Sequence, residues 1–138
     1  MTVLYRPKML WITRSAPFGL ASARQCGSEG IPALAVPVLQ IRPLAVSRPE
    51  EVPDAILFTS AQGVRLHPFD PRWKDVAVLT VGDATAEQAT AKGYSDVRSA
   101  AGDVLDLKAL TAATLPRRAR IFLFGAREAA GGVAPPAP

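Results

Sequence analysis

A strand, a turn and a helix meet at residues 76–92, in a pattern suited to holding an anion. Residues 76–81 form a β-branched apolar run that predicts a buried strand, and the helix-forming residues 84–92 follow a two-residue turn. Ligands of open α/β sheets bind where the carboxyl end of a strand meets the start of a helix. Helix amides and the helix dipole favour a negative charge there. Gly82 and Thr85 are therefore candidate anion-binding residues.

Two further predicted strands end in polar side chains. Thr13, Arg14 and Ser15 follow the apolar residues that begin at Met9, and Thr59 and Ser60 end a second apolar run. Ser15 is placed either to cap the next helix or to contact an anion. Hydroxyl groups and an arginine in such turns are typical contacts for carboxylates.

Each of these residues also has a local structural interpretation. Thr59 and Ser60 can cap the helix that follows them, because Ser and Thr are favoured N-cap residues. Asp83 is expected to be the N-cap of its own helix rather than a general acid. Thr85 can be a helix-start residue without a ligand, and Arg14 can be a surface arginine. The residue types alone leave both interpretations open.

The elements that position these turns alternate between strand and helix patterns. The apolar residues 9–13 show no alternation, which predicts a strand buried on both faces, and Leu20, Ala23 and Cys26 are expected on one side of the first helix. Asp103 is expected to cap the last helix. The alternation predicts an α/β fold with a mostly parallel sheet. The expected strands are residues 9–13, 31–37, 55–59, 76–81, 96–99 and 120–124, and the expected helices are residues 19–27, 61–66, 84–92 and 104–114.

Composition narrows the functional classes. The chain has 138 residues, of which 49% are hydrophobic, and its net charge is +4. A mild positive charge suits an anionic ligand but needs no special explanation. Aromatic residues do not interleave with the basic ones, and helix-turn-helix and zinc-finger spacings are missing, so nucleic acid is not an expected partner. Cys26 and His67 are the only residues of their types, which excludes a cysteine framework and a metal cluster.

Short motifs, in order along the chain, resemble one enzyme family. They are WITR at residues 11–14, VPVLQI at 36–41, DAILFTSAQGV at 54–64, VGDATA at 81–86, DVR at 96–98 and GD at 102–103. The VGDATA segment resembles the Val-Gly-x-x-Thr-Ala turn of uroporphyrinogen-III synthase. The other motifs resemble that family's opening strand, its proline-containing crossover and its strand ending in Phe-Thr-Ser.

The resemblance implies two similar parallel-sheet α/β domains, the first discontinuous and only partly present. Residues 1–40 would be the amino-terminal β-α-β piece of the first domain, and residues 41–53 the interdomain linker. Residues 54–126 would be an incomplete second domain, and residues 127–138 a disordered tail rich in Pro, Ala and Gly. The chain is expected to be truncated relative to the family.

The resemblance also implies a reaction. The family closes the linear tetrapyrrole hydroxymethylbilane to uroporphyrinogen III, with loss of water and inversion of the last pyrrole ring, and needs no cofactor or metal. A cytoplasmic monomer without nucleic acid or membrane partners is expected. Tyr5 and Tyr94 do not match the family's tyrosine proton donor, so no catalytic residue is assigned. The implied substrate-binding residues are Thr13, Arg14, Ser15, Thr59, Ser60, Gln62, Gly82, Thr85 and Ala86.

Two other functions remain as alternatives. One is a catalytically inactive α/β fragment that binds an anion or a tetrapyrrole. The other is a flavodoxin-like receiver or nucleotide-binding domain. The second is disfavoured because Asp54 precedes its strand, Asp83 stands alone, and neither GxGxxG nor GxxxxGK[ST] occurs.

Overall fold

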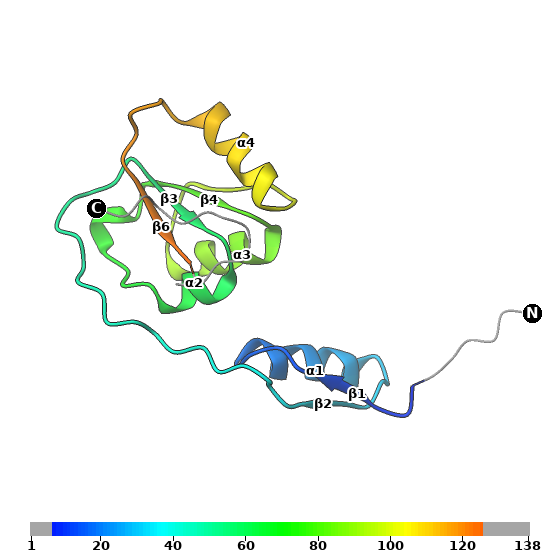
Figure 1. Ribbon diagram of the computed structural model, residues 1–138. Coiled ribbons are helices and arrows are strands. Elements are labelled where there is room, and N and C mark those ends of the chain that lie inside the picture. The colour runs from blue at the N-terminus through cyan, green and yellow to red at the C-terminus, as the bar shows by residue number, and fades with distance from the viewer. Residues whose placement is uncertain (1–6, 126–138) are drawn as a thin grey trace, which may run out of the picture. The chain divides into compact units, whose positions relative to one another are not determined.

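The computed structural model describes residues 7–125, and the chain divides after Ala45 into two compact units. Both units are α/β with parallel strands (Figure 1), which confirms the predicted α/β class with a mostly parallel sheet. The expected tail, residues 127–138, and Tyr5 lie outside the described residues. Among residues 7–125, no helix is long and apolar enough to cross a membrane.

Unit 1 is a single β-α-β element. Strand β1 (Leu10–Ile12) and strand β2 (Ala33–Ala35) pair in parallel, with Leu10 opposite Ala33, and helix α1 (Phe18–Ser28) connects them. Gly19 is required at the start of α1, since a Cβ there would lie 2.3 Å from the carbonyl oxygen of Arg14. The close approach of helix and turn therefore depends on a missing side chain.

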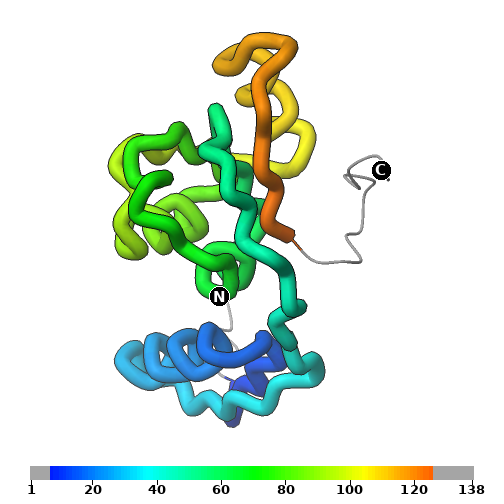
Figure 2. The backbone as a smooth tube through the Cα atoms, turned by 90° about the vertical axis from the view of Figure 1, so that its left-hand side faces the viewer, coloured from blue at the N-terminus to red at the C-terminus, as the bar shows by residue number. Residues whose placement is uncertain are grey.

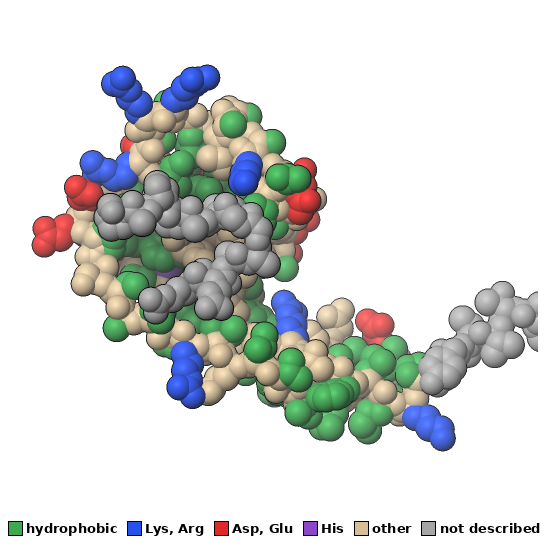
Figure 3. All heavy atoms as spheres, in the orientation of Figure 1, with side chains coloured by type: hydrophobic (Ala, Val, Ile, Leu, Met, Phe, Trp, Pro, Cys, Tyr) green, Lys and Arg blue, Asp and Glu red, His purple; other side chains and the backbone are tan. Residues whose placement is uncertain are grey.

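Two sequence predictions for unit 1 are wrong. β1 is not buried on both faces, because α1 covers only one side of a two-stranded sheet and Trp11 is 63% exposed. Leu20 is exposed as well, since the inward face of α1 is set by Gly19, Ala23 and Cys26. Apolar side chains are consequently visible on the surface of unit 1 (Figure 3).

Unit 2 is built on a sheet of four parallel strands in the order β5-β4-β3-β6. The central strand β3 pairs on both sides, with Phe58 opposite Thr80 of β4 and Phe124 of β6. Figure 1 shows β3 and β6 side by side although they are far apart in sequence, and Figure 2 shows the same unit turned by 90°. The strands are β3 (Ala55–Phe58), β4 (Ala77–Thr80), β5 (Val97–Ser99) and β6 (Ile121–Phe124).

Helices cover the two faces of the unit 2 sheet unequally. In Figure 1, α2 (Ala61–Leu66) and α3 (Asp83–Lys92) lie on one face and α4 (Val104–Thr114) on the other. Ile56 and Phe58 are fully buried in the core beneath α2 and α3. Leu57, which points to the opposite face because strand side chains alternate, is only half-buried. The face under α4 is thus less completely covered.

The helix ends of unit 2 agree in part with prediction. Asp103 caps α4, and with Asp106 it forms a capping box in which each carboxylate accepts from a backbone amide. Gly93 ends α3 with φ of 123°, a conformation that favours glycine. The expectation that Asp83 caps α3 is wrong. Gly82 is the N-cap and Asp83 is the first helical residue, so α3 begins without a capping side chain.

The buried side chain of His67 connects the end of α2 to Tyr94, which follows α3, through two hydrogen bonds. Nδ1 of His67 lies 2.6 Å from the carbonyl oxygen of Val64, which can only accept, so Nδ1 carries the proton. The Tyr94 hydroxyl then donates to Nε2 at 2.7 Å. Nearby, the ammonium of Lys92 donates to the carbonyl oxygens of Val64 and Arg65 at the end of α2. These bonds satisfy carbonyls that the helix end leaves open.

Burial sets the protonation of this cluster. Desolvation, helped by the charge of Lys92, lowers the pKa of His67 from 6.5 to about 4, so its ring is neutral at pH 7. Desolvation also raises the pKa of Tyr94. In the adjoining loop, hydrogen bonds from Arg72 lower the pKa of Asp70 to about 2. Tyr94 packs against the sheet, since its side chain is buried among Phe58, His67 and Phe69.

We expect unit 2 to lose stability as the pH falls from 6.5 toward 4. The unfolded chain takes up a proton on His67 over this interval and the folded chain does not, which costs on the order of 1–2 kcal/mol. Urea unfolding followed by the fluorescence of the buried Trp73 measures this loss. His67→Phe should flatten the pH dependence between 6.5 and 4 whatever its effect at pH 7. An equal slope in both proteins would show that His67 titrates normally.

Candidate functional site

The predicted turns of unit 2 lie at one edge of its sheet. Because β3 and β4 are parallel and in register from Ala55–Ala77 to Phe58–Thr80, their carboxyl ends lie side by side. Thr59 and Ser60 follow β3, and Gly82 follows β4 at the start of α3. The structure therefore brings these two predicted turns together at the edge where ligands of such sheets bind.

The start of α2 is closed by its own side chains. The Ser60 hydroxyl is the N-cap and accepts from the amide of Gly63 at 3.3 Å. Oε1 of Gln62 accepts from Nε of Arg65 at 2.9 Å. Gly63 is needed here because a Cβ would lie 2.8 Å from the carbonyl oxygen of Phe124. The capping interpretation of Ser60 is confirmed, and the local contacts of this turn are largely structural.

The start of α3 is open. Gly82 brings no side chain to accept from the first helical amides, and nothing lies within 4 Å of the position its Cβ would take. The amide of Ala86 already donates to the carbonyl oxygen of Gly82 at 3.1 Å. The amides available to a ligand are therefore those of residues 83–85, and not that of Ala86. Helix geometry leaves these first amides without an intrahelical partner.

Two side chains modify this helix start. Thr85 is buried, with 8% of its surface exposed, so most of its side chain packs toward the sheet. Asp83 is exposed in the first turn, where its carboxylate is favoured by the helix dipole but repels a second anion. An anionic ligand therefore needs a basic group in addition to the amides.

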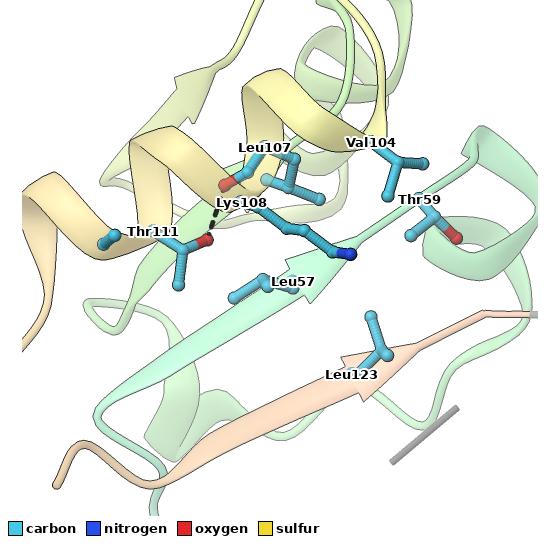
Figure 4. Close-up of a pocket in the computed structure, with 8 residues that line it drawn as sticks. Leu57, Thr59, Val104, Leu107, Lys108, Thr111 and Leu123 are labelled. Carbon is cyan, nitrogen blue, oxygen red and sulfur yellow. Dashed lines mark hydrogen bonds between the residues drawn. The ribbon is translucent and has the colours of Figure 1, made fainter. Parts of the chain in front are cut away.

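Thr59 differs from its neighbours because it faces the side of the sheet covered by α4. It lines a pocket of about 230 Å³ between α4 and strands β3 and β6 (Figure 4). This pocket was not predicted from the sequence. The pocket-lining residues of α4 follow an i, i+3, i+4, i+7, i+8 spacing that could have been found. The lining residues are Leu57, Thr59, Val104, Leu107, Lys108, Thr111, Ala112 and Leu123.

The third predicted turn belongs to unit 1. Thr13, Arg14 and Ser15 directly follow β1, as expected. Arg14 folds back onto α1, where Nη1 donates to the Ser22 hydroxyl at 3.3 Å and the guanidinium lies 5.1 Å from the ring centre of Phe18. Arg14 is exposed, and these contacts lie within unit 1. Both observations support the interpretation of Arg14 as a surface residue.

The described residues offer no metal centre. Across residues 7–125, no group of three or more His, Cys, Asp or Glu side chains is placed to hold a metal ion. His67 is held by Val64 and Tyr94 in the core, as described above, and Cys26 is a half-buried free thiol of α1.

Comparison with known proteins identifies the family. The family model described as uroporphyrinogen-III synthase HemD matches residues 21–133, which include every predicted site residue of unit 2. This match confirms the resemblance of the motifs, and the chain belongs to the uroporphyrinogen-III synthase family. The matched segment begins within α1, after Thr13, Arg14 and Ser15. No curated protein matches the chain.

We expect Gly82→Asp to stabilise unit 2 and to block its anion contact. A carboxylate at the N-cap would accept from the open amides and interact with the helix dipole, which adds about 0.5–1 kcal/mol. Urea unfolding tests the first effect. Titration with acetate, followed by the amide NMR signals of residues 83–85, tests the second. Gly82→Ala is the control, because it adds no acceptor. If acetate leaves those signals unmoved in the unmodified chain, the helix start is not an anion site.

Proposed function

We propose that this chain converts hydroxymethylbilane into uroporphyrinogen III. The family match supports a role in tetrapyrrole biosynthesis, and the observation that carries the specific proposal is the uncapped start of α3. It lies in the VGDATA segment, beside the turn that ends β3. A polycarboxylate tetrapyrrole supplies the anionic groups that such a helix start binds.

The reaction sets three requirements on the protein. The carbon–oxygen bond of the hydroxymethyl group must break, and the departing hydroxyl must receive a proton so that it leaves as water. The two ends of the linear tetrapyrrole must be held close enough for the new carbon–carbon bond to form. The substrate's carboxylates must be held while the last ring turns over. Amides of residues 83–85 and the hydroxyl of Thr59 are suited to the third task.

The predicted site residues take different places in this proposal. Gly82 leaves the first amides of α3 open to the carboxylate, Thr85 contacts it, and Ala86 orders the same turn through its bond to Gly82. Ser60 and Gln62 hold the neighbouring turn in shape. Thr13, Arg14 and Ser15 are proposed to hold another carboxylate at the start of α1. Residues 1–40 and 54–126 are proposed to correspond to the family's first-domain piece and second domain.

A tetrapyrrole-binding chain without ring-closing activity is the second candidate. It is favoured by the state of Tyr94, the only tyrosine among the described residues. Tyr94 is buried, its hydroxyl donates to His67, and its pKa is raised. It is therefore not available to protonate a leaving group at the sheet edge. A protein of this kind would keep the carboxylate contacts but would have no group to protonate the leaving hydroxyl.

A coupled assay separates the two candidates. Hydroxymethylbilane is produced in the cuvette by its own synthase, and the oxidised products are separated by isomer. Type III product above the spontaneous type I background is the result we expect. Type I product alone, from a chain that unfolds cooperatively and still binds the tetrapyrrole, would instead establish the non-catalytic candidate.

Thr85→Val tests the carboxylate contact within the proposed reaction. Valine has nearly the shape of threonine, so the core position is kept, and loss of a hydrogen bond to a charged group should raise KM about tenfold. Thr90→Val on the same helix is the matched control, since its hydroxyl donates only to the carbonyl oxygen of Ala86. An unchanged KM in Thr85→Val, with an unchanged melting temperature, would remove Thr85 from the site.

A further inference from the structure

The pocket under α4 has the character of a binding site rather than a packing defect. Its floor is formed by Leu57 and Leu123, which are register partners on β3 and β6 and are both only half-buried. Leu107 forms part of its roof. An apolar cavity of about 150 Å³ holds a benzene ring. The volume here, about 230 Å³, leaves room for one ring and a short side chain.

The pocket also lies at the place where α/β sheets bind ligands. The strand order β5-β4-β3-β6 reverses between β3 and β6, since the chain proceeds outward to β5 and returns beside β3. Crevices at the carboxyl ends of strands flanking such a reversal are the usual ligand sites of open sheets. Thr59, at the carboxyl end of β3, lines the pocket at this point.

One cation accompanies the apolar walls. Lys108 projects from α4 over the sheet between Leu57 and Thr59 (Figure 4). Within the described part of the chain, its ammonium has no ion pair or hydrogen bond. Asp103 and Asp106, the acidic residues of the same helix region, are engaged in the capping box. The hydroxyl of Thr111 donates to the carbonyl oxygen of Leu107, which leaves Lys108 and Thr59 as the polar groups open to a ligand.

We propose that this pocket binds a small carboxylic acid that carries one apolar ring. The ring lies between Leu57, Leu107 and Leu123, and the carboxylate meets the ammonium of Lys108 and the hydroxyl of Thr59. The inference rests on the geometry of the pocket and does not require the ring-closing reaction. The same chemistry fits a free aromatic acid and a single pyrrole ring with its propionate.

The test uses the full chain and 3-phenylpropionate as the probe, followed by protein NMR. We expect weak, saturable binding that shifts the methyl signals of Leu57, Leu107 and Leu123. The uncharged 3-phenylpropanamide should bind about tenfold more weakly than the acid. Lys108→Gln should remove this preference for the acid, and Lys74→Gln, which alters an exposed lysine outside the pocket, should not.

Several results would overturn the inference. They are an absence of binding, shifts confined to residues outside the pocket, and equal affinities for the acid and the amide in the unmodified chain. A second arm with a pyrrole propionate identifies the source of the ligand. Tighter binding of the pyrrole acid than of the phenyl acid would assign the pocket to one ring of a tetrapyrrole, and equal binding would assign it to free aromatic acids.

Discussion

The central position of strand β3 is the constraint on which the rest of unit 2 depends. β3 pairs along its whole length with β4 on one side and β6 on the other, so it fixes the register of both neighbours. Its side chains alternate between two different environments. Ile56 and Phe58 enter the fully packed layer under α2 and α3, and Leu57 enters the half-covered layer under α4. A shift of one residue would exchange these environments and bury the wrong side chains.

The packed layer is held by polar bonds as well as apolar contacts. His67 ends α2, and its two ring nitrogens join the last turn of that helix to Tyr94 beyond the end of α3. Lys92 crosses between the same two helices to reach the α2 carbonyls. Because Val64, His67 and Tyr94 are buried and Lys92 is half-buried, losing one of these partners leaves another unsatisfied. The network therefore fixes α2 against α3 and, with them, the two turns at the sheet edge.

Much of this arrangement could be predicted from the sequence. The strand and helix patterns of unit 2, the Asp103 cap and the Gly93 helix end all follow from local periodicity and known terminal preferences. The predictions that failed concern which side chains are buried, because burial depends on the elements that pack over them. The β1 pattern predicted burial on both faces, but burial depends on how many layers pack against a strand. Lys108 was not predicted either, since a lysine at helical spacing gains a role only when the opposite wall of its pocket is known.

The three helix starts at the carboxyl edge of the sheet show how stability and binding are divided. Ser60 caps α2 and Asp103 caps α4, but Gly82 leaves α3 without a cap. A serine or aspartate at position 82 would fit without strain, since φ there is −138° and nothing lies within 4 Å of a Cβ. Of these three helices, α3 alone therefore lacks the stabilisation that a capping side chain would provide. Local rules are characteristically broken at sites where function requires open groups. The contrast between α3 and the two capped helices thus points to an anion site at α3, in a chain that belongs to a tetrapyrrole enzyme family.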